Sequence, residues 1–238
     1  IYPENKGFKV NIATTTNFSE PENFVVLECV NKLLGKGYRP ENIELERTWT
    51  LGHKQKGGRA DICVSDQNGK MLFIVECKTY GSEYNKEMKN ILSDGGQLIS
   101  YWQQDRGCRW LVLYASNING NDEIEYTTDS INCSDDENIL NLAKKDPTIL
   151  LYKNAHTVPE LYKVWKETYE QRFSGNIIFS KDSVAYDIGV KLLRKKDLKD
   201  CSGNDKIVNR FEEILRHNNV SDKENAFNRL IALFICKL

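Results

Sequence analysis

The chain has 238 residues, of which 40% are hydrophobic and 28% are charged. These proportions are typical of a globular protein and exclude a disordered one, and the length suits one domain with an appendage. The formal net charge of −1 does not indicate nucleic-acid binding, because sequence-independent affinity for DNA comes mostly from Lys and Arg that neutralise phosphates. If the protein binds DNA, it needs a local basic groove or a partner that contributes affinity.

The cysteines indicate a reducing compartment. The chain has 7 cysteines, scattered and without a Cys-x-x-Cys pair. Cys29, Cys63, Cys77 and Cys236 lie in apolar runs, where a free thiol behaves as a small hydrophobe. This usage argues against a disulfide framework or a zinc site and favours the cytoplasm. The 3 histidines form no ligand-spaced pair, and we see no signal peptide and no apolar run long enough to cross a membrane.

Residues 1–18 show no recognisable pattern. A helix is predicted between Ser19–Glu22, which has capping-box spacing with a proline in the first turn, and Gly35. Glu28 is the single ionisable residue in its apolar run. A buried carboxylate needs a partner, so Glu28 is predicted to pair with a nearby basic residue such as Arg59, unless it has the functional role that the resemblance described below implies.

A strand is predicted over 43–51, with apolar and charged residues alternating. The segment 53–58 then has the composition of a flexible basic loop. Lys54, Lys56 and Arg59 are candidates for contacts with phosphate, and a solvated loop is the alternative.

The segment 57–80 is predicted to form a β-hairpin. Asn68-Gly69 is the pair best suited to a two-residue type I′ turn. With that turn, Asp61 lies opposite Glu76, at a Cβ separation of about 4.5–5.5 Å. Strand alternation places Glu76 and Lys78 on one face and Cys77 on the other.

Two carboxylates and an amine therefore meet at the open end of this hairpin. Hard cations such as Mg²⁺ take carboxylate oxygens and water, and a lysine can stabilise charge on a phosphoryl group. A solvated Asp–Glu–Lys cluster without function is the alternative, and a register slip of one residue would separate the groups.

The rest of the chain alternates between helices and strands. A short helix is predicted within 81–94 and another over 97–104, in which Gln97 and Tyr101 share a face. These two side chains are candidates for hydrogen bonds to a phosphate or a metal-bound water; a buried structural hydrogen bond is the alternative. Further predictions are strands over 110–115, 123–128 and 148–152, a short helix after Ser134, and a helix over 158–173. From Ser183 the pattern is amphipathic and all-helical, with a basic run over 191–199.

Several of these features together resemble a known family. They are an Asp separated by 14 residues from Glu-Cys-Lys, a Gly-Gly-Arg run before the Asp, an acidic residue on an upstream helix (Glu28), and Gln-x-x-x-Tyr after the Lys. The set resembles the PD-(D/E)XK nuclease superfamily, in particular its RecB-like and type I restriction R-subunit branch. Ala60 stands where that motif often has a proline. The tail is similar to the helical region before the catalytic domain of N6-adenine DNA methyltransferases.

The resemblance implies an α/β fold with a restriction-endonuclease-like core, a mixed central sheet flanked by helices, and a C-terminal helical appendage. The expected boundaries are 1–182 for the nuclease domain and 183–238 for the helical segment.

The resemblance also implies a Mg²⁺-dependent DNA endonuclease, with Mn²⁺ as a substitute, acting as the cleavage module of a restriction-modification enzyme. Asp61, Glu76 and the carbonyl of Cys77 would bind the metal, with Glu28 as an outer or second-metal ligand. Lys78 would orient the attacking water or stabilise the developing charge. Expected partners are double-stranded DNA and the methyltransferase and specificity domains or subunits of the same system. The rivals are a non-catalytic DNA-binding or assembly module and a repair or recombination nuclease.

Overall fold

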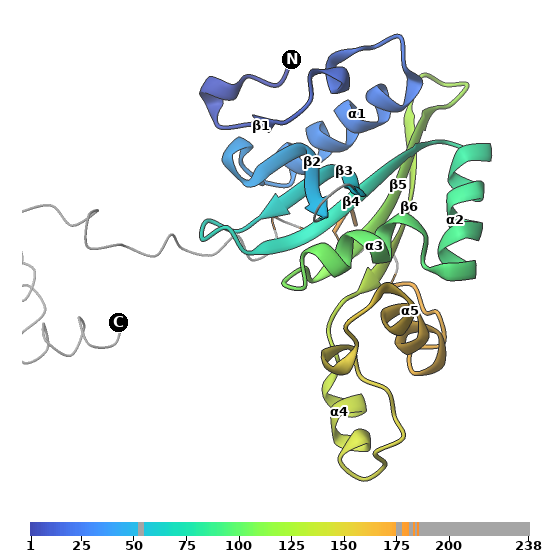
Figure 1. Cartoon of the computed structure of the whole chain (residues 1–238). Coiled ribbons are helices and arrows are strands. Elements are labelled where there is room, and N and C mark those ends of the chain that lie inside the picture. Colours follow the sequence, from blue (N-terminus) through green and yellow to red (C-terminus); the bar gives the residue numbers. More distant parts are fainter. Residues whose placement is uncertain (52–54, 175–177, 181–182, 184, 186–238) are drawn as a thin grey trace, which may run out of the picture. The chain divides into compact units, whose positions relative to one another are not determined.

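A computed structural model of the chain describes residues 1–51, 55–174, 178–180, 183 and 185 (Figure 1). These residues all lie within one compact unit, Ile1–Leu192. The predicted helical segment 183–238, its basic run and Lys54 fall almost wholly outside the described residues, so the predicted domain boundary stays a prediction.

The fold is α/β, with a six-stranded mixed sheet in the order β1-β2-β3-β4-β5-β6. β1 is parallel to β2, β4 is parallel to β5, and the other neighbours are antiparallel. The strands are β1 (Lys9–Val10), β2 (Ile43–Leu51), β3 (Gln55–Ser65), β4 (Met71–Thr79), β5 (Trp110–Ile118) and β6 (Ile124–Asn132). In the described part of the chain the helices are α1 (Pro21–Gly35), α2 (Ser82–Asp94), α3 (Gly96–Gln104), α4 (Glu137–Ala143) and α5 (Val158–Glu167), with 3-10 turns at Glu4–Lys6, Ala13–Thr16, Pro40–Asn42 and Tyr152–Asn154.

Helices cover both faces of the sheet, and each face has its own hydrophobic core (Figure 1). One core packs α1 against side chains such as Ile62, Val75 and Cys77. The other packs α2, α3 and α5 against side chains such as Cys63 and Ile74. Because β4 is buried on both faces, its sequence is an apolar run without alternation, as expected of a central strand. The predicted mixed sheet flanked by helices is confirmed, and it is consistent with a restriction-endonuclease-like core.

Residues 1–18, which show no pattern in the sequence, are part of this fold. β1 pairs with β2, and Tyr2, Phe8 and Thr15 are buried. The segment follows the outer edge of the sheet, where a two-residue strand is too short to produce a recognisable period.

Helix α1 has the predicted bounds, but the predicted capping box is wrong. Pro21 is the first helical residue, which makes Glu20 the N-cap, and no side chain caps this end. Ser19 lies one residue too early, and its hydroxyl donates to the Asn17 side-chain oxygen at 2.6 Å.

The predicted two-residue turn of the hairpin is also wrong, but the register that follows from it is right. Only Gly69 has a positive φ, of 82°, whereas a type I′ turn needs a second such residue at Asn68. The turn is instead longer, and the Asp66 carboxylate accepts hydrogen bonds from the backbone N–H groups of Asn68 and Lys70, both at 2.8 Å. A register shift between Val64 and Ser65 offsets the extra length.

The C-terminal part of the described chain differs from the sequence prediction in two places. The predicted strand over 148–152 is absent from the described residues; the N–H groups of Tyr152 and Lys153 donate to the Asp135 carboxylate at 2.9 and 3.1 Å instead of to a neighbouring strand. Helix α5 ends at Glu167, before two residues with positive φ, Glu170 and Gln171. Among the described residues, no helix is long and apolar enough to cross a membrane.

Candidate active site

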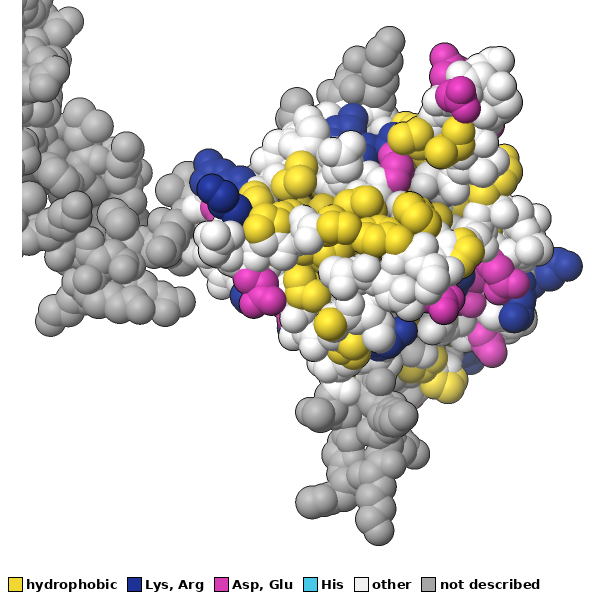
Figure 2. Space-filling view, turned by 90° about the horizontal axis from the view of Figure 1, so that it is seen from above, with side chains coloured by type: hydrophobic (Ala, Val, Ile, Leu, Met, Phe, Trp, Pro, Cys, Tyr) yellow, Lys and Arg dark blue, Asp and Glu magenta, His cyan; other side chains and the backbone are white. Residues whose placement is uncertain are grey.

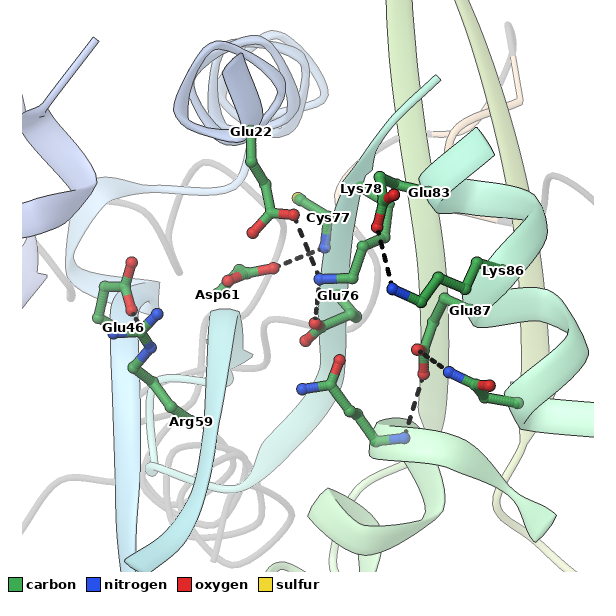
Figure 3. A network of polar contacts seen from close by, with 12 residues as sticks. Glu22, Glu46, Arg59, Asp61, Glu76, Cys77, Lys78, Glu83, Lys86 and Glu87 are labelled. Atoms are coloured by element: carbon green, nitrogen blue, oxygen red, sulfur yellow. Dashed lines mark hydrogen bonds and ion pairs between the residues drawn. The ribbon is translucent and has the colours of Figure 1, made fainter. Parts of the chain in front are cut away.

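The candidate site lies where β3 and β4 separate (Figure 3). The last pair in the ladder between these strands is Ile62 with Val75, so Asp61 and Glu76 are the next residues on the two strands. The backbone N–H of Cys77 donates to Asp61 Oδ2 at 2.7 Å. A side chain thus takes the place of a backbone carbonyl as the partner of Cys77, and the two acidic residues lie close together as predicted.

Both carboxyl groups are buried, with relative exposures of 6% for Asp61 and 2% for Glu76. Burial raises the pKa of Asp61 well above its ordinary value; the Glu76 carboxylate adds to this, while the Cys77 N–H and Lys78 oppose it. Burial also raises the pKa of Glu76, to about 7, although Lys78 and the Tyr101 hydroxyl lower it. The protein therefore holds two acidic groups where neither ionises easily without a cation.

Lys78 connects the strand to helix α1. Its Nζ lies 2.6 Å from Glu76 Oε1 and 3.3 Å from Glu22 Oε2. Burial lowers the pKa of Lys78, but the adjacent Glu76 outweighs it, so the pKa is above its ordinary value and the amine stays charged. The sequence does not single out Glu22, in the first turn of α1, because its spacing from Ser19 indicates only a capping box. We call Glu22, Asp61, Glu76 and Lys78 the carboxylate cluster.

Glu28, the helix residue expected at this site, lies elsewhere. The Tyr114 hydroxyl donates to Glu28 Oε2, and Lys32 Nζ lies 3.3 Å from Oε1. The expectation that Glu28 needs a partner is confirmed, but the partners are a tyrosine on β5 and a lysine one turn along α1, not Arg59 or the cluster.

A second acidic residue that the sequence does not single out is Glu46 on β2. Its neighbours Leu45 and Arg47 pair with Ile62 and Ala60, so Glu46 lies opposite Asp61. It is 4% exposed and has a φ of 56°. Alternation along β2 grouped Glu46 with Glu44 as a polar residue, and only the register across three strands shows its position.

Arg59 forms an ion pair with Glu46, with Nε 2.8 Å from Oε2. The Arg59 side chain is half exposed, so it is accessible to a phosphate, as the prediction requires. Lys54 lies outside the described residues, and Lys56 lies in β3 with a side chain that the structure does not describe.

Tyr101 is buried and holds Glu76. Its hydroxyl lies 3.0 Å from Glu76 Oε2 and 2.6 Å from the Arg59 carbonyl oxygen, and its ring stacks on Trp49 with centroids 5.6 Å apart. This position corresponds to the predicted alternative of a buried structural hydrogen bond, because a side chain that is 1% exposed does not reach a phosphate. Gln97 is exposed, and its backbone N–H donates to Glu87 Oε1 at 3.2 Å.

An apolar groove lies beside the cluster. It has a volume of about 740 Å³ and is lined by α1, the ends of β4 and β5, and Ile124. Phe24, Tyr80 and Ile118 in its lining are all more than half exposed. Figure 2 shows apolar side chains gathered in a band on the face seen from above. The described lining residues include Glu28 and neither Lys nor Arg, so the groove does not suit a phosphate backbone.

The donor atoms of the cluster suit a hard cation. Asp61 and Glu76 offer carboxylate oxygens, which Mg²⁺ prefers over nitrogen or sulfur. Within the part of the chain that the structure describes, no three His, Cys, Asp or Glu side chains are disposed to hold one ion. That agrees with the usual Mg²⁺ site, which takes one or two carboxylates and completes its shell with water and phosphate. The Cys77 thiol is buried against α1 and offers no ligand.

The fold and the cluster together define an α/β domain in which two buried carboxylates and a lysine meet at the end of a central hairpin. Residues 21–132 match the family model of the type I restriction enzyme R protein N terminus. The match includes every residue of the cluster and supports a restriction-enzyme N-terminal domain over that part of the chain. No curated protein matches the sequence.

Proposed function

We propose that this protein contains a Mg²⁺-dependent endonuclease domain, which cleaves DNA phosphodiester bonds as part of a restriction-modification system. The observation that carries the proposal is the pair of buried carboxylates, Asp61 and Glu76, next to the charged Lys78. Placing two ionisable acids in one buried site costs free energy unless a cation joins them. The family match of residues 21–132 supplies the restriction context.

In this proposal Asp61, Glu76 and the backbone carbonyl of Cys77 would hold the ion. Bound Mg²⁺, for which Mn²⁺ can substitute, would lower the pKa of a water and neutralise charge on the phosphodiester. Glu22, whose carboxylate lies 3.3 Å from Lys78 Nζ, would take the outer role through a metal-bound water.

The other residues position these groups. Lys78 orients the attacking water or stabilises negative charge on the phosphate. Tyr101 holds Glu76 through its hydroxyl. Arg59 and Gln97, both exposed, contact the phosphates of the substrate, together with Lys54 and Lys56.

The partners in this proposal are double-stranded DNA and the methyltransferase and specificity domains or subunits of the same system. The net charge of −1 gives the chain little affinity of its own for DNA, so those partners would supply much of the binding and the sequence specificity.

The test is nicking of supercoiled plasmid with Mg²⁺, with Mn²⁺ and with EDTA. We expect metal-dependent nicking by the wild type and a loss of about 10²–10³-fold in Lys78→Ala, with no nicking by Asp61→Ala. Glu44→Gln, on β2 and paired with Arg47 at 3.6 Å, is the matched control and should retain the wild-type rate. Nicking retained by both Asp61→Ala and Lys78→Ala would overturn the assignment.

Calorimetric titration with Mn²⁺ addresses the main rival, a non-catalytic DNA-binding or assembly module. The proposal expects one binding event that Asp61→Asn abolishes. A wild-type protein that binds DNA and no Mn²⁺ would favour the rival.

A further inference from the structure

Glu46 has an unusual backbone for a residue in the middle of a strand. Its φ of 56° lies in the left-handed region, which residues with a side chain rarely adopt. The flanking pairs, Leu45 with Ile62 and Arg47 with Ala60, are regular. The deviation is therefore confined to the one position of β2 opposite Asp61, and strain of this kind persists only where its surroundings maintain it.

In the ion pair between Glu46 and Arg59, the Glu46 side chain is buried and the Arg59 side chain is exposed. The Glu46 side chain is 5% exposed and the Arg59 side chain is 51% exposed. Arg59 can therefore exchange partners, and its planar guanidinium binds phosphate as well as carboxylate. Glu46 has no such freedom, because β2 and β3 hold it in the sheet.

The buried position of Glu46 and the exposed position of Arg59 are connected by the free-energy cost of an uncompensated buried carboxylate. Removing the partner of a buried charge is strongly unfavourable unless another charge compensates it. Glu46 lies opposite Asp61 on the neighbouring strand, and Figure 3 shows both residues in the same region as Glu22 and Glu76. Glu22 raises the pKa of Glu46, of Asp61 and of Glu76, so its charge acts on each of the other three acids. A divalent cation at Asp61 and Glu76 would therefore stabilise Glu46 as well.

We propose that Glu46 couples DNA binding to cation binding through Arg59. In the free protein Arg59 neutralises Glu46. When DNA binds, Arg59 moves to a phosphate, and the divalent cation held by Asp61 and Glu76 then compensates Glu46. Each ligand thus strengthens the other, as thermodynamic linkage requires. This inference rests on the proposed function, and it gives Glu46 a positioning role that the nuclease motif does not include.

The experiment measures binding of a double-stranded oligonucleotide at low salt by fluorescence anisotropy, with EDTA and with Ca²⁺, which takes the same oxygen ligands as Mg²⁺. We expect Ca²⁺ to tighten DNA binding by the wild type about tenfold. In Glu46→Gln, Arg59 is free without a cation, so this variant should bind DNA in EDTA about as tightly as the wild type does in Ca²⁺. The further effect of Ca²⁺ on it should be clearly smaller than tenfold, and what remains comes from direct contact of the ion with phosphate.

Two other variants make the result specific. Glu44→Gln, which removes a carboxylate from the same strand, should keep the tenfold effect of Ca²⁺ that we expect of the wild type. Arg59→Gln should bind DNA weakly, with the same reduced response to Ca²⁺ as Glu46→Gln. It should also bind Ca²⁺ in the absence of DNA more tightly than the wild type does, because its Glu46 carboxylate has no internal cation. Arg59→Gln tests the coupling even if Glu46→Gln does not fold, which circular dichroism will show.

The inference is overturned if Glu46→Gln or Arg59→Gln responds to Ca²⁺ as the wild type does, or if the wild type shows no response. In either case the plasmid assay with Asp61→Ala and Lys78→Ala still decides the proposed function. Loss of metal-dependent nicking in those variants, with coupling unchanged in Glu46→Gln, would leave the nuclease and remove only the coupling.

Discussion

Two acidic neighbourhoods on helix α1 and the adjacent strands contrast with each other. Around Glu28, one carboxylate has two partners, the Tyr114 hydroxyl and Lys32. Around Asp61, four carboxylates, Glu22, Glu46, Asp61 and Glu76, share Lys78 and Arg59. The first arrangement is electrostatically complete and needs nothing more. Among the described residues, the second has two positive charges for four acids, three of which are buried, and such an imbalance is typical of a functional centre.

The largest expected effect concerns stability against pH. The folded state raises the pKa of Glu76 from 4.5 to about 7, so it binds this proton more tightly than the unfolded chain does. The contribution to stability is complete below about pH 4.5, falls as pH rises through this window, and is lost above about pH 7. This shift corresponds to about 3 kcal/mol. We therefore expect the metal-free protein to be less stable at pH 8 than at pH 5 in urea unfolding, with Asp61 adding to the trend.

Two controls sharpen that measurement. Glu76→Gln should flatten the pH dependence, whereas Glu28→Gln should keep the wild-type slope. Mn²⁺ should restore stability at pH 8, since it compensates the ionised carboxylates. Stability that rises with pH through this window would contradict the difference between the two neighbourhoods.

A smaller effect on stability is expected at Gly58, which lies against the Tyr101 ring beside the carboxylate cluster. A Cβ added at Gly58 would lie 2.6 Å from Tyr101 Cε1, so Gly58→Ala should displace the ring and cost about 2 kcal/mol in the free energy of unfolding. Because the Tyr101 hydroxyl contacts Glu76, the variant should also bind Mn²⁺ more weakly in calorimetry. Gly35→Ala, with open space around the added Cβ, is the matched control. Equal stability of the two variants would show that Gly58 is not needed for this contact.

The smallest effect is expected at Glu28. Glu28→Gln keeps an acceptor for the Tyr114 hydroxyl and loses the ion pair with Lys32, whose side chain is 22% exposed. Thermal unfolding should therefore report a loss of no more than about 1 kcal/mol. Mn²⁺ affinity and plasmid nicking should stay at the wild-type level. A variant that lost nicking without losing stability would return Glu28 to the active site.

The hairpin illustrates how far the sequence could predict this site. The predicted turn type at Asn68-Gly69 is wrong, but the predicted register up to Ile62 and Val75 is right, because a register shift between Val64 and Ser65 offsets the longer turn. The reverse holds for helix α1. Its predicted bounds are right, but the sequence points to Glu28 whereas the structure places Glu22 3.3 Å from Lys78 Nζ, since a helix pattern does not reveal which acidic residue meets a strand more than 50 residues later in the chain.

Local pattern alone therefore determined the elements: α1, the central hairpin, α3, and the spacing that brings Asp61, Glu76 and Lys78 together. These follow from interactions between residues close in sequence. Only the tertiary structure decided that Glu22 and Glu46 join them, that Tyr101 is a buried support, and that residues 1–18 complete the sheet edge. Those outcomes depend on contacts between distant segments, whose register and burial a single strand or helix does not encode.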